Sequence, residues 1–333
     1  MPEPEIVRIV REFKDGLAAL EAAQMNEMAR RWLQVEAGLS AEIAALAYEV
    51  NEIRVAGGIV STWKLAEMDR YRELLRQTRI EMTNYIAWAE GQVAAAQLQW
   101  GILGRQMALD SILSAYGGGV IANFATLPIE AIQAMVGLAG DGSPLLQLLM
   151  NSWPDAVDGL TEALLKAVAQ GINPRDTAKA MADGLADGLN RMLVIARTEQ
   201  IRAFRESAYQ QYVASGVVEG FYRISAHDDR VCAACLFAEG EFYPLDSGER
   251  LDDHPQGRCA MVPKVKGMPA VEFQLGKDWF KEQDEETQRN IIGDAKWDAW
   301  QDGKFELEDL VTKTQDDTWG GSLTPTPLSE LLG

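Results

Sequence analysis

The chain has 333 residues, of which 47% are hydrophobic, and its formal net charge at pH 7 is −19. This length and composition indicate a globular chain of about two domains. Broad nucleic-acid binding is not expected, because nucleic-acid affinity depends largely on Lys and Arg side chains that displace counterions from phosphates. Three cysteines do not suggest a secreted disulfide framework, and we expect no export signal, so a reducing cytoplasm is where we expect the chain to be made.

The first segment, residues 1–115, has the pattern of long amphipathic helices. Apolar residues recur mostly at three- and four-residue steps from Ile6 to Ile53, which predicts one helix with a buried stripe. Gly57 and Gly58 interrupt this pattern, and a second one runs on from Leu65. We therefore expect two long antiparallel helices.

The second segment, residues 116–190, is predicted to be a helical, apolar connecting region. Its most apolar stretch runs from Gly117 to Gly140, and a membrane-active segment is one interpretation of it. Asn123, Pro128 and Glu130 lie inside this stretch, and each is costly in hydrocarbon. We therefore expect a buried hairpin or helix pair, and membrane association is not favoured.

The character of the sequence changes after Gly216, which is placed to end the last long helix. Residues 217–226 predict a strand, and shorter strand-like pieces follow at 242–243 and 259–265. These pieces predict a compact α+β domain with its own core over residues 191–268.

The last segment, residues 269–333, is acidic and rich in tryptophan. It predicts short helices that pack on the preceding domain, followed by an extended tail after Gly320. The whole chain is therefore predicted to be α+β, with a long, mostly helical N-terminal half, a small α+β domain and a short helical acidic C-terminal module.

All three cysteines and one of the two histidines fall within one short segment. Cys232 and Cys235 have the spacing of a zinc knuckle, in which two thiolates face one tetrahedral cation. His254 and Cys259 can return from a second arm and complete a Cys₃His set. We therefore predict a structural zinc ion bound by these four side chains.

Three simpler interpretations of this segment stay open. Cys232 and Cys235 fit equally well as small buried core residues. They also fit a reversible disulfide, although Asp228 and Asp229 nearby disfavour the thiolate that redox chemistry needs. His254 fits a simple hydrogen bond to a backbone carbonyl.

An enzyme is not expected. A nuclease of the HNH type needs a general-base histidine and further metal ligands, and the remaining histidine, His227, precedes the knuckle. No phosphate-binding glycine loop or Ser-His-Asp set is recognisable, and the many carboxylates are spread over predicted helix faces.

Several motifs follow one another in a fixed order between residues 196 and 263. They are "ARTE" at the start of a helix, Gly216, "DDRVCAAC", a Gly-Phe-like step at 240–242, "HPQGRC" and Pro263. In this order they resemble the phage Mu F-like head morphogenesis domain of minor head proteins in tailed bacteriophages and prophages. The final motif of that family usually reads His-Pro-x-Cys-Arg-Cys. Here Gly257 replaces the first cysteine, which leaves Cys259 as the candidate ligand from that arm.

The resemblance implies a minor component of the virion that is made in the host cytoplasm. It implies a structural role at the portal protein, with the procapsid or major capsid components as further partners, during head morphogenesis and DNA packaging or ejection. The alternatives are an enzyme delivered with the virion, such as an HNH-like nuclease or a toxin-type module, and a membrane-active ejection protein. For Arg197 and Glu199 we expect ion pairs with neighbouring helices.

The long helices between Ile6 and Gln106 are the expected docking surface for the portal or for neighbouring capsid components. A two-helix hairpin cannot bury such wide apolar stripes by itself, and large tryptophan anchors are typical of interfaces. The alternative is that helices from residues 110–190 cover these stripes inside one helical domain. The anchors would be Trp32, Trp63, Trp88 and Trp100.

Overall fold

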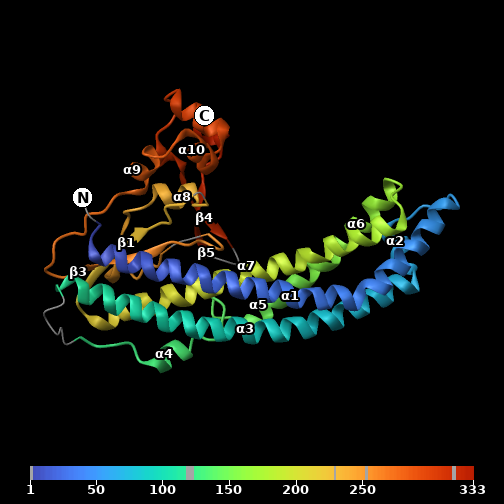
Figure 1. The fold of residues 1–333 in the computed structure, drawn as a ribbon, viewed down its shortest axis with the longest axis horizontal. Coiled ribbons are helices and arrows are strands. Elements are labelled where there is room, and N and C mark those ends of the chain that lie inside the picture. Colours follow the sequence, from blue (N-terminus) through green and yellow to red (C-terminus); the bar gives the residue numbers. More distant parts are fainter. Residues whose placement is uncertain (1–2, 118–123, 229, 252–253, 317–319) are drawn as a thin grey trace. The chain divides into compact units, whose positions relative to one another are not determined.

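The computed structural model describes residues 3–117, 124–228, 230–251, 254–316 and 320–333. Within these ranges the chain forms an α+β fold with a long helical half followed by a small sheet-containing region, as the sequence predicted (Figure 1). The helices of the first part are α1 (Glu5–Val55), α2 (Thr62–Glu67), α3 (Asp69–Ala115), α4 (Ile129–Gln133), α5 (Leu145–Met150), α6 (Ser152–Ala169) and α7 (Pro174–Ser215). The later elements are β1 (Val218–Ile224), α8 (Ala233–Phe237), β2 (Phe242–Pro244), β3 (Ala260–Val265), α9 (Gly276–Lys281), α10 (Glu285–Ile292), α11 (Asp294–Gln301), β4 (Val311–Asp316), β5 (Gly320–Pro325) and α12 (Leu328–Leu331), with 3₁₀ turns at Leu245–Ser247 and Leu307–Leu310.

The predicted pair of long antiparallel helices is confirmed by α1 and α3. The Tyr85 hydroxyl donates to the carbonyl of Met28 at 2.9 Å, and the Gln24 amide donates to the carbonyl of Gln92 at 3.1 Å. From Tyr85 to Gln92 the chain of α3 advances, whereas the contacted residues of α1 go back from Met28 to Gln24, as antiparallel packing requires. The break falls at Gly57, whose φ of 82° lies in the left-handed region that glycine tolerates.

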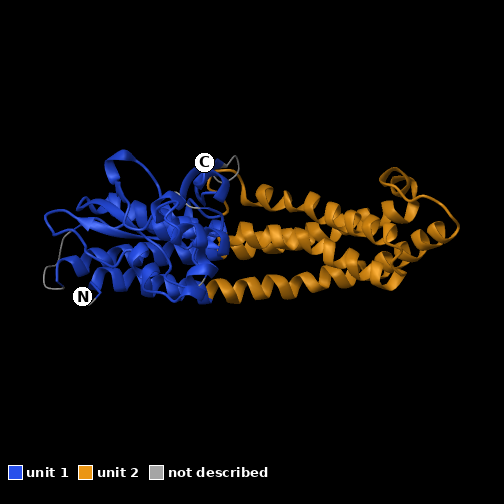
Figure 2. Cartoon of the chain, turned by 90° about the horizontal axis from the view of Figure 1, so that it is seen from above, with its two compact units in different colours: residues 1–19, 96–136, 198–333 blue, residues 20–95, 137–197 orange. Residues whose placement is uncertain are grey.

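The chain falls into two compact units, each built from separate stretches of sequence (Figure 2). Unit 1 contains residues 1–19, 96–136 and 198–333, and unit 2 contains residues 20–95 and 137–197. The helices α1, α3 and α7 each contribute residues to both units. The four consecutive segments expected from the sequence therefore cut across both units.

Unit 2 is a helical assembly in which α6 and α7 join the long pair. The Tyr71 hydroxyl on α3 lies 2.9 Å from the Thr161 hydroxyl on α6. A Cβ atom added at Gly184 on α7 would lie 2.3 Å from the carbonyl oxygen of Gly159 on α6, so these two helices meet backbone to backbone. The apolar stripes of α1 and α3 are buried here, with Trp32 only 1% exposed and edge-on to Tyr85.

The expectation that four tryptophans serve as docking anchors is wrong for two of them. Trp32 lies in the interior of unit 2, and Trp100 is 2% exposed in the interior of unit 1. Both side chains already have partners within the chain, so they leave no surface for another protein. Trp63 differs, because 72% of it is exposed.

Unit 1 is built around a three-stranded antiparallel sheet with the order β2–β1–β3. All three strands lie where the sequence predicted them. Phe221 of β1 pairs with Tyr243 of β2 and with Pro263 of β3, and the Phe221 and Tyr243 rings stack at 5.1 Å. The core under the sheet combines residues from the start of α1, the end of α3 and the second half of α7, including Val7, Val10, Trp100, Met107, Phe204 and Tyr212.

The acidic C-terminal module contains the predicted short helices α9, α10 and α11. Phe280, Ile292, Phe305 and Leu307 share one core with α8. The expected extended tail is a strand: β5 pairs with β4 in an antiparallel hairpin that the sequence analysis did not recognise.

The apolar stretch between Gly117 and Gly140 differs from the expected hairpin or helix pair. Residues 118–123 lie outside the described residues, and the described remainder contains the short helix α4 and irregular backbone. The buried Gln211 side chain of α7 accepts from the amide of Leu127 at 2.7 Å and donates to the carbonyl of Ala125 at 3.0 Å. These two bonds give hydrogen-bond partners to the amide of Leu127 and the carbonyl of Ala125, which lie outside any helix or strand. No helix of the described chain has both the length and the apolar character that crossing a bilayer requires.

Candidate metal centre

The first arm of the site is a single turn at the start of α8. Cys232 is the N-cap residue of this helix, and Cys235 lies three residues further on. The amide of Leu236 donates to the carbonyl of Cys232 at 2.9 Å and closes the turn. Residues three apart lie on the same side of a helical turn, so the knuckle spacing brings the two sulfur atoms together.

The second arm is the tight turn that carries His254. The amide of Gly257 donates to the carbonyl of His254 at 2.9 Å. Gln256 has a φ of 64°, which is uncommon for a residue with a side chain, and its amide donates to the Thr198 hydroxyl of α7 at 3.1 Å. The helix thus holds this turn in place.

Two arginines fasten the arms to each other and to α7. Arg258, four residues after His254, binds both carboxylate oxygens of Asp228 at 2.6 and 2.8 Å. Asp228 in turn lies four residues before Cys232, so this two-pronged ion pair joins the flanks of both arms. Arg205 of α7 donates to the carbonyls of Gly257 and Cys259, each at 2.8 Å.

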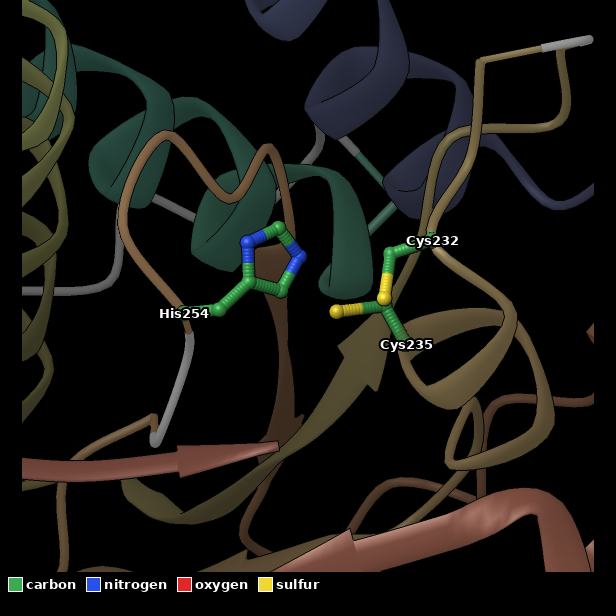
Figure 3. Close-up of side chains that lie close together, drawn as sticks. All are labelled: Cys232, Cys235 and His254. Atoms are coloured by element: carbon green, nitrogen blue, oxygen red, sulfur yellow. The ribbon is translucent and has the colours of Figure 1, made fainter. Parts of the chain in front are cut away.

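These contacts bring Cys232, Cys235 and His254 together. Their ligand atoms all lie within 4.8 Å of one another, and Figure 3 shows the imidazole ring of His254 pointing toward the two sulfurs. Nδ1 of His254 lies 2.8 Å from the carbonyl of Pro255. A hydrogen bond from Nδ1 to this carbonyl fixes the tautomer and leaves Nε2 with a lone pair for a cation.

The local electrostatics favour a thiolate in this group. A hydrogen bond from Cys235, assisted by His254 and opposed by burial, lowers the pKa of Cys232 to about 4. The expectation that Asp228 disfavours the thiolate is wrong, because the charge of Asp228 is offset by Arg258. Asp229 lies outside the described residues.

Cys259 is not a member of the three-residue group. It lies just before β3 and is 2% exposed in the same core as Cys235. Lys14 of α1 interacts with Cys259, although burial dominates there and lowers the pKa of Lys14 to about 8. The assignment of Cys259 as the fourth ligand stays a prediction.

The donor set fits a borderline-soft cation that prefers tetrahedral geometry. Two sulfurs and one imidazole nitrogen are typical of zinc, whose bonds to sulfur and nitrogen are about 2.3 and 2.0 Å long. No disulfide joins the three cysteines, so the group is open to a metal. With three ligands in place, the cation would have a fourth position for Cys259 or for a water molecule.

The second histidine belongs to a different cluster. Nε2 of His227 lies 2.6 Å from the buried carboxylate of Glu239, and the ring stacks on Trp279. His227 also lines a cavity of about 820 Å³ together with Arg11. Sequence reasoning missed Glu239, because nothing in its neighbourhood marks it as a histidine partner.

The ion pairs expected for the "ARTE" motif are found in part between helices. Arg197 of α7 lies 2.9 Å from Glu21 of α1, whereas the buried Glu199 pairs with Arg202 of its own helix at 3.2 Å. Within this motif Arg197 therefore joins α7 to α1, and the Thr198 hydroxyl holds the turn that carries His254.

The chain was not found to resemble any known protein closely enough to show its family. No family model matches it, and neither the curated proteins nor the solved structures contain a significant match.

Proposed function

We propose that the chain is a minor head protein of a tailed bacteriophage, with a structural role at the portal during head morphogenesis. The observation that carries the proposal is that two separate motifs of the resemblance, "DDRVCAAC" and "HPQGRC", come together in space. They meet through the Asp228–Arg258 pair and place Cys232, Cys235 and His254 in one group. Motifs that build one site are more specific than either spacing alone.

The metal in this proposal is a structural zinc ion. It would join α8 to the turn before β3, two elements separated by more than fifteen residues. Binding free energy at such a site contributes directly to folding. The chemistry that zinc supplies here is cross-linking, because the group combines two thiols and one imidazole that are tied to backbone turns on both sides.

The arrangement favours a structural role over a nuclease. A metal-dependent nuclease needs a general base beside the metal. The imidazole of His254 faces the sulfurs, and His227 is engaged by Glu239 and Trp279 in another cluster. A plasmid incubated with the protein and Mg²⁺ or Mn²⁺ should therefore show no cleavage above a His254→Ala control.

The test is the location of the chain in assembled heads. The full-length chain is expressed with the neighbouring head genes of its source genome, and procapsids are purified and imaged by cryo-electron microscopy. We expect density for the chain at the portal vertex, in few copies. Procapsids that assemble beside abundant soluble chain yet contain none of it would contradict the proposal.

A further inference from the structure

The chain between β3 and α9 contains a stretch, residues 269–275, that has the side-chain pattern of a strand but no partner strand. This 269–275 segment forms no helix, strand or turn (Figure 1). Its alternate side chains Val271, Phe273 and Leu275 are partly buried, and the side chains between them are exposed. Val271 and Phe273 pack against the core of unit 1. A two-residue period of this kind is typical of a strand with one covered face.

The main chain of this segment lacks hydrogen-bond partners. From Ala270 to Gln274, no amide or carbonyl group of the main chain bonds to another residue that the structure describes. The flanking carbonyls differ, because that of Met268 accepts from Lys264 and that of Leu275 accepts from amides of α9. A row of unpaired donors and acceptors on an extended chain is a template for the addition of another strand.

Two cavities lie along the 269–275 segment, and both are lined by residues of unit 1. The smaller, of about 490 Å³, adjoins the stretch from Met268 to Glu272, and its other lining side chains are apolar. The larger, of about 820 Å³, adjoins the stretch from Val271 to Leu275. Successive side chains on one face of an added strand would therefore meet first one cavity and then the other.

The basic groups of the larger cavity are already matched by acidic ones. The Arg11 guanidinium lies 2.8 Å from the Glu3 carboxylate and 3.8 Å from that of Glu239. The His227 ring is held by the same Glu239 at 2.6 Å. These groups therefore leave no positive charge in excess for a ligand.

Two further carboxylates of the larger cavity have no cation beside them. Glu272 and Asp278 are both exposed, and neither forms an ion pair with any residue in the described part of the chain. Lys277, which follows the cavity in sequence, pairs with Glu308 at 2.9 Å instead. The larger cavity is thus suited to a ligand that carries positive charge.

From these observations we propose that the 269–275 segment binds an extended peptide of a partner protein by strand addition. The main chain of the peptide pairs with the groups from Ala270 to Gln274. A lysine or arginine of the peptide enters the larger cavity beside Glu272 and Asp278, and an apolar side chain on the same face enters the smaller one. The aromatic ring of Tyr222, which also lines the larger cavity, contributes a further attraction for the cation. This inference goes beyond the proposed head function and does not depend on it.

The main chain and the charge together favour a basic peptide over other occupants. A small cation would neutralise the carboxylates but would leave the main-chain groups unpaired. A second copy of this chain has a net charge of −19 and would bring more acidic than basic groups to the cavity. Main-chain pairing supplies affinity in strand addition, and the cavities for alternate side chains supply specificity.

The test is fluorescence polarisation of a labelled synthetic peptide, Thr-Arg-Thr-Leu-Thr-Arg-Thr, with the full-length protein. This sequence reads the same in both directions, so it places arginine and leucine on one face in either strand orientation. We expect it to bind, and we expect a peptide with glutamate in place of arginine to bind about tenfold or more weakly. Hydrogen exchange, followed by mass spectrometry, should slow at the amides of residues 270–274 in the complex.

The double variant Glu272→Gln/Asp278→Asn should lose about tenfold or more in affinity for the arginine peptide. The matched control is Glu286→Gln/Asp302→Asn, which removes two exposed carboxylates that line neither cavity. It should bind the peptide within about twofold of the wild type, and circular dichroism melts verify that both variants are folded.

Three results would overturn the proposal. The first is a wild-type chain that does not bind the arginine peptide. The second is an equal loss in both double variants, because the peptide would then respond only to the overall charge of the chain. The third is unchanged hydrogen exchange at residues 270–274 in the saturated complex, because the peptide would then bind elsewhere.

Discussion

Cys232 carries a thiol with a pKa of about 4, so it is a thiolate at neutral pH, and thiolates are the form that binds metal. Its neighbours in the group are a second thiol and an imidazole whose tautomer is set by the carbonyl of Pro255. Because the group already favours the thiolate at neutral pH, zinc binding at Cys232 does not have to displace a proton from this sulfur.

The first prediction concerns zinc itself. Purified protein should contain close to one zinc ion per chain by elemental analysis, and Cys232→Ser should lose it together with several °C of melting temperature, because zinc affinity at such a site is folding energy. Removal of zinc from the wild type with a chelator should give the same loss. Metal-free wild-type protein with an unchanged melt would contradict the assignment.

The variant Cys259→Ala tests whether Cys259 is the fourth zinc ligand. If Cys259 binds zinc, as the sequence predicts, this variant should lose zinc affinity as Cys232→Ser does. X-ray absorption spectroscopy of the wild type should then count three sulfur neighbours. Two sulfurs and an unchanged affinity would instead restrict the protein ligands to the three that the structure brings together.

The second prediction concerns the ion pair between Arg258 and Asp228. Both partners lie outside the ligand group, yet they join the two arms, so Arg258→Met or Asp228→Asn should weaken zinc binding by about 10- to 100-fold. A hydrogen bond from Arg258 lowers the pKa of Asp228. The folded-state pKa is therefore below the unfolded value, and the pair contributes stability that is complete above the unfolded value and lost as the pH falls through the folded one.

The control for this pair is Lys277→Met, which breaks an exposed ion pair with Glu308 far along the sequence. It should leave zinc affinity unchanged in a competition titration. The double variant Arg258→Met/Asp228→Asn should bind zinc no more weakly than the single variant with the lower zinc affinity, because both substitutions break the same interaction. Additive losses would show that the two side chains act separately.

At the scale of elements, the contact between α6 and α7 depends on glycine. A Cβ atom at Gly184 would lie 2.3 Å from the carbonyl oxygen of Gly159, which is closer than real Cβ atoms approach. The third prediction is that Gly184→Ala lowers the unfolding free energy by about 1–3 kcal/mol, as overpacking does. Chemical denaturation of the full chain measures it.

The same substitution at Gly91 is the matched control. Gly91 lies inside α3, and a Cβ atom there meets nothing within 4 Å. Gly91→Ala should therefore stabilise the chain by about 0.5–1 kcal/mol, because alanine is the better helix former. If both substitutions raised the unfolding free energy, α6 and α7 would be able to move apart at Gly184 without loss of stability.

The elements show where sequence reasoning succeeds and where it fails. Hydrophobic periodicity and helix-breaking glycines predicted α1, α3 and the strands of unit 1, because these signals depend only on residues close together in sequence. The pairing of α1 with α3 was predicted, but the burial of Trp32 against Tyr85 was not, since it depends on packing between distant segments. The Cys232–Cys235 pair could be recognised from its spacing. The contacts that Arg205 and Asp228 make around the metal centre could not be predicted, because charged residues occur throughout this acidic sequence and only the fold shows which ones lie near the site.

At the scale of the whole molecule, the sheet and the metal centre lie in a unit whose core is assembled from three separate stretches. The expectation that residues 191–268 have their own core is therefore wrong. Val7 and Val10 from α1, with Trp100 and Met107 from α3, pack in the same cluster as Phe204 and the strands. Long helices allow this arrangement, because one helix supplies a stripe to each unit.

The last prediction follows from this shared core. A chain that begins near residue 190 lacks every α1 and α3 residue of the cluster and exposes the face of α7 that carries Phe204 and Tyr212. It should show no cooperative melt and should bind the hydrophobic dye ANS, even with zinc present. A chain that ends at Thr326 loses only exposed and partly buried side chains, among them Leu331 at the edge of the C-terminal core, so it should keep a cooperative melt. A cooperative, zinc-dependent melt of the first chain would show that the strands and the metal suffice for folding, and that the α1 and α3 contacts are dispensable.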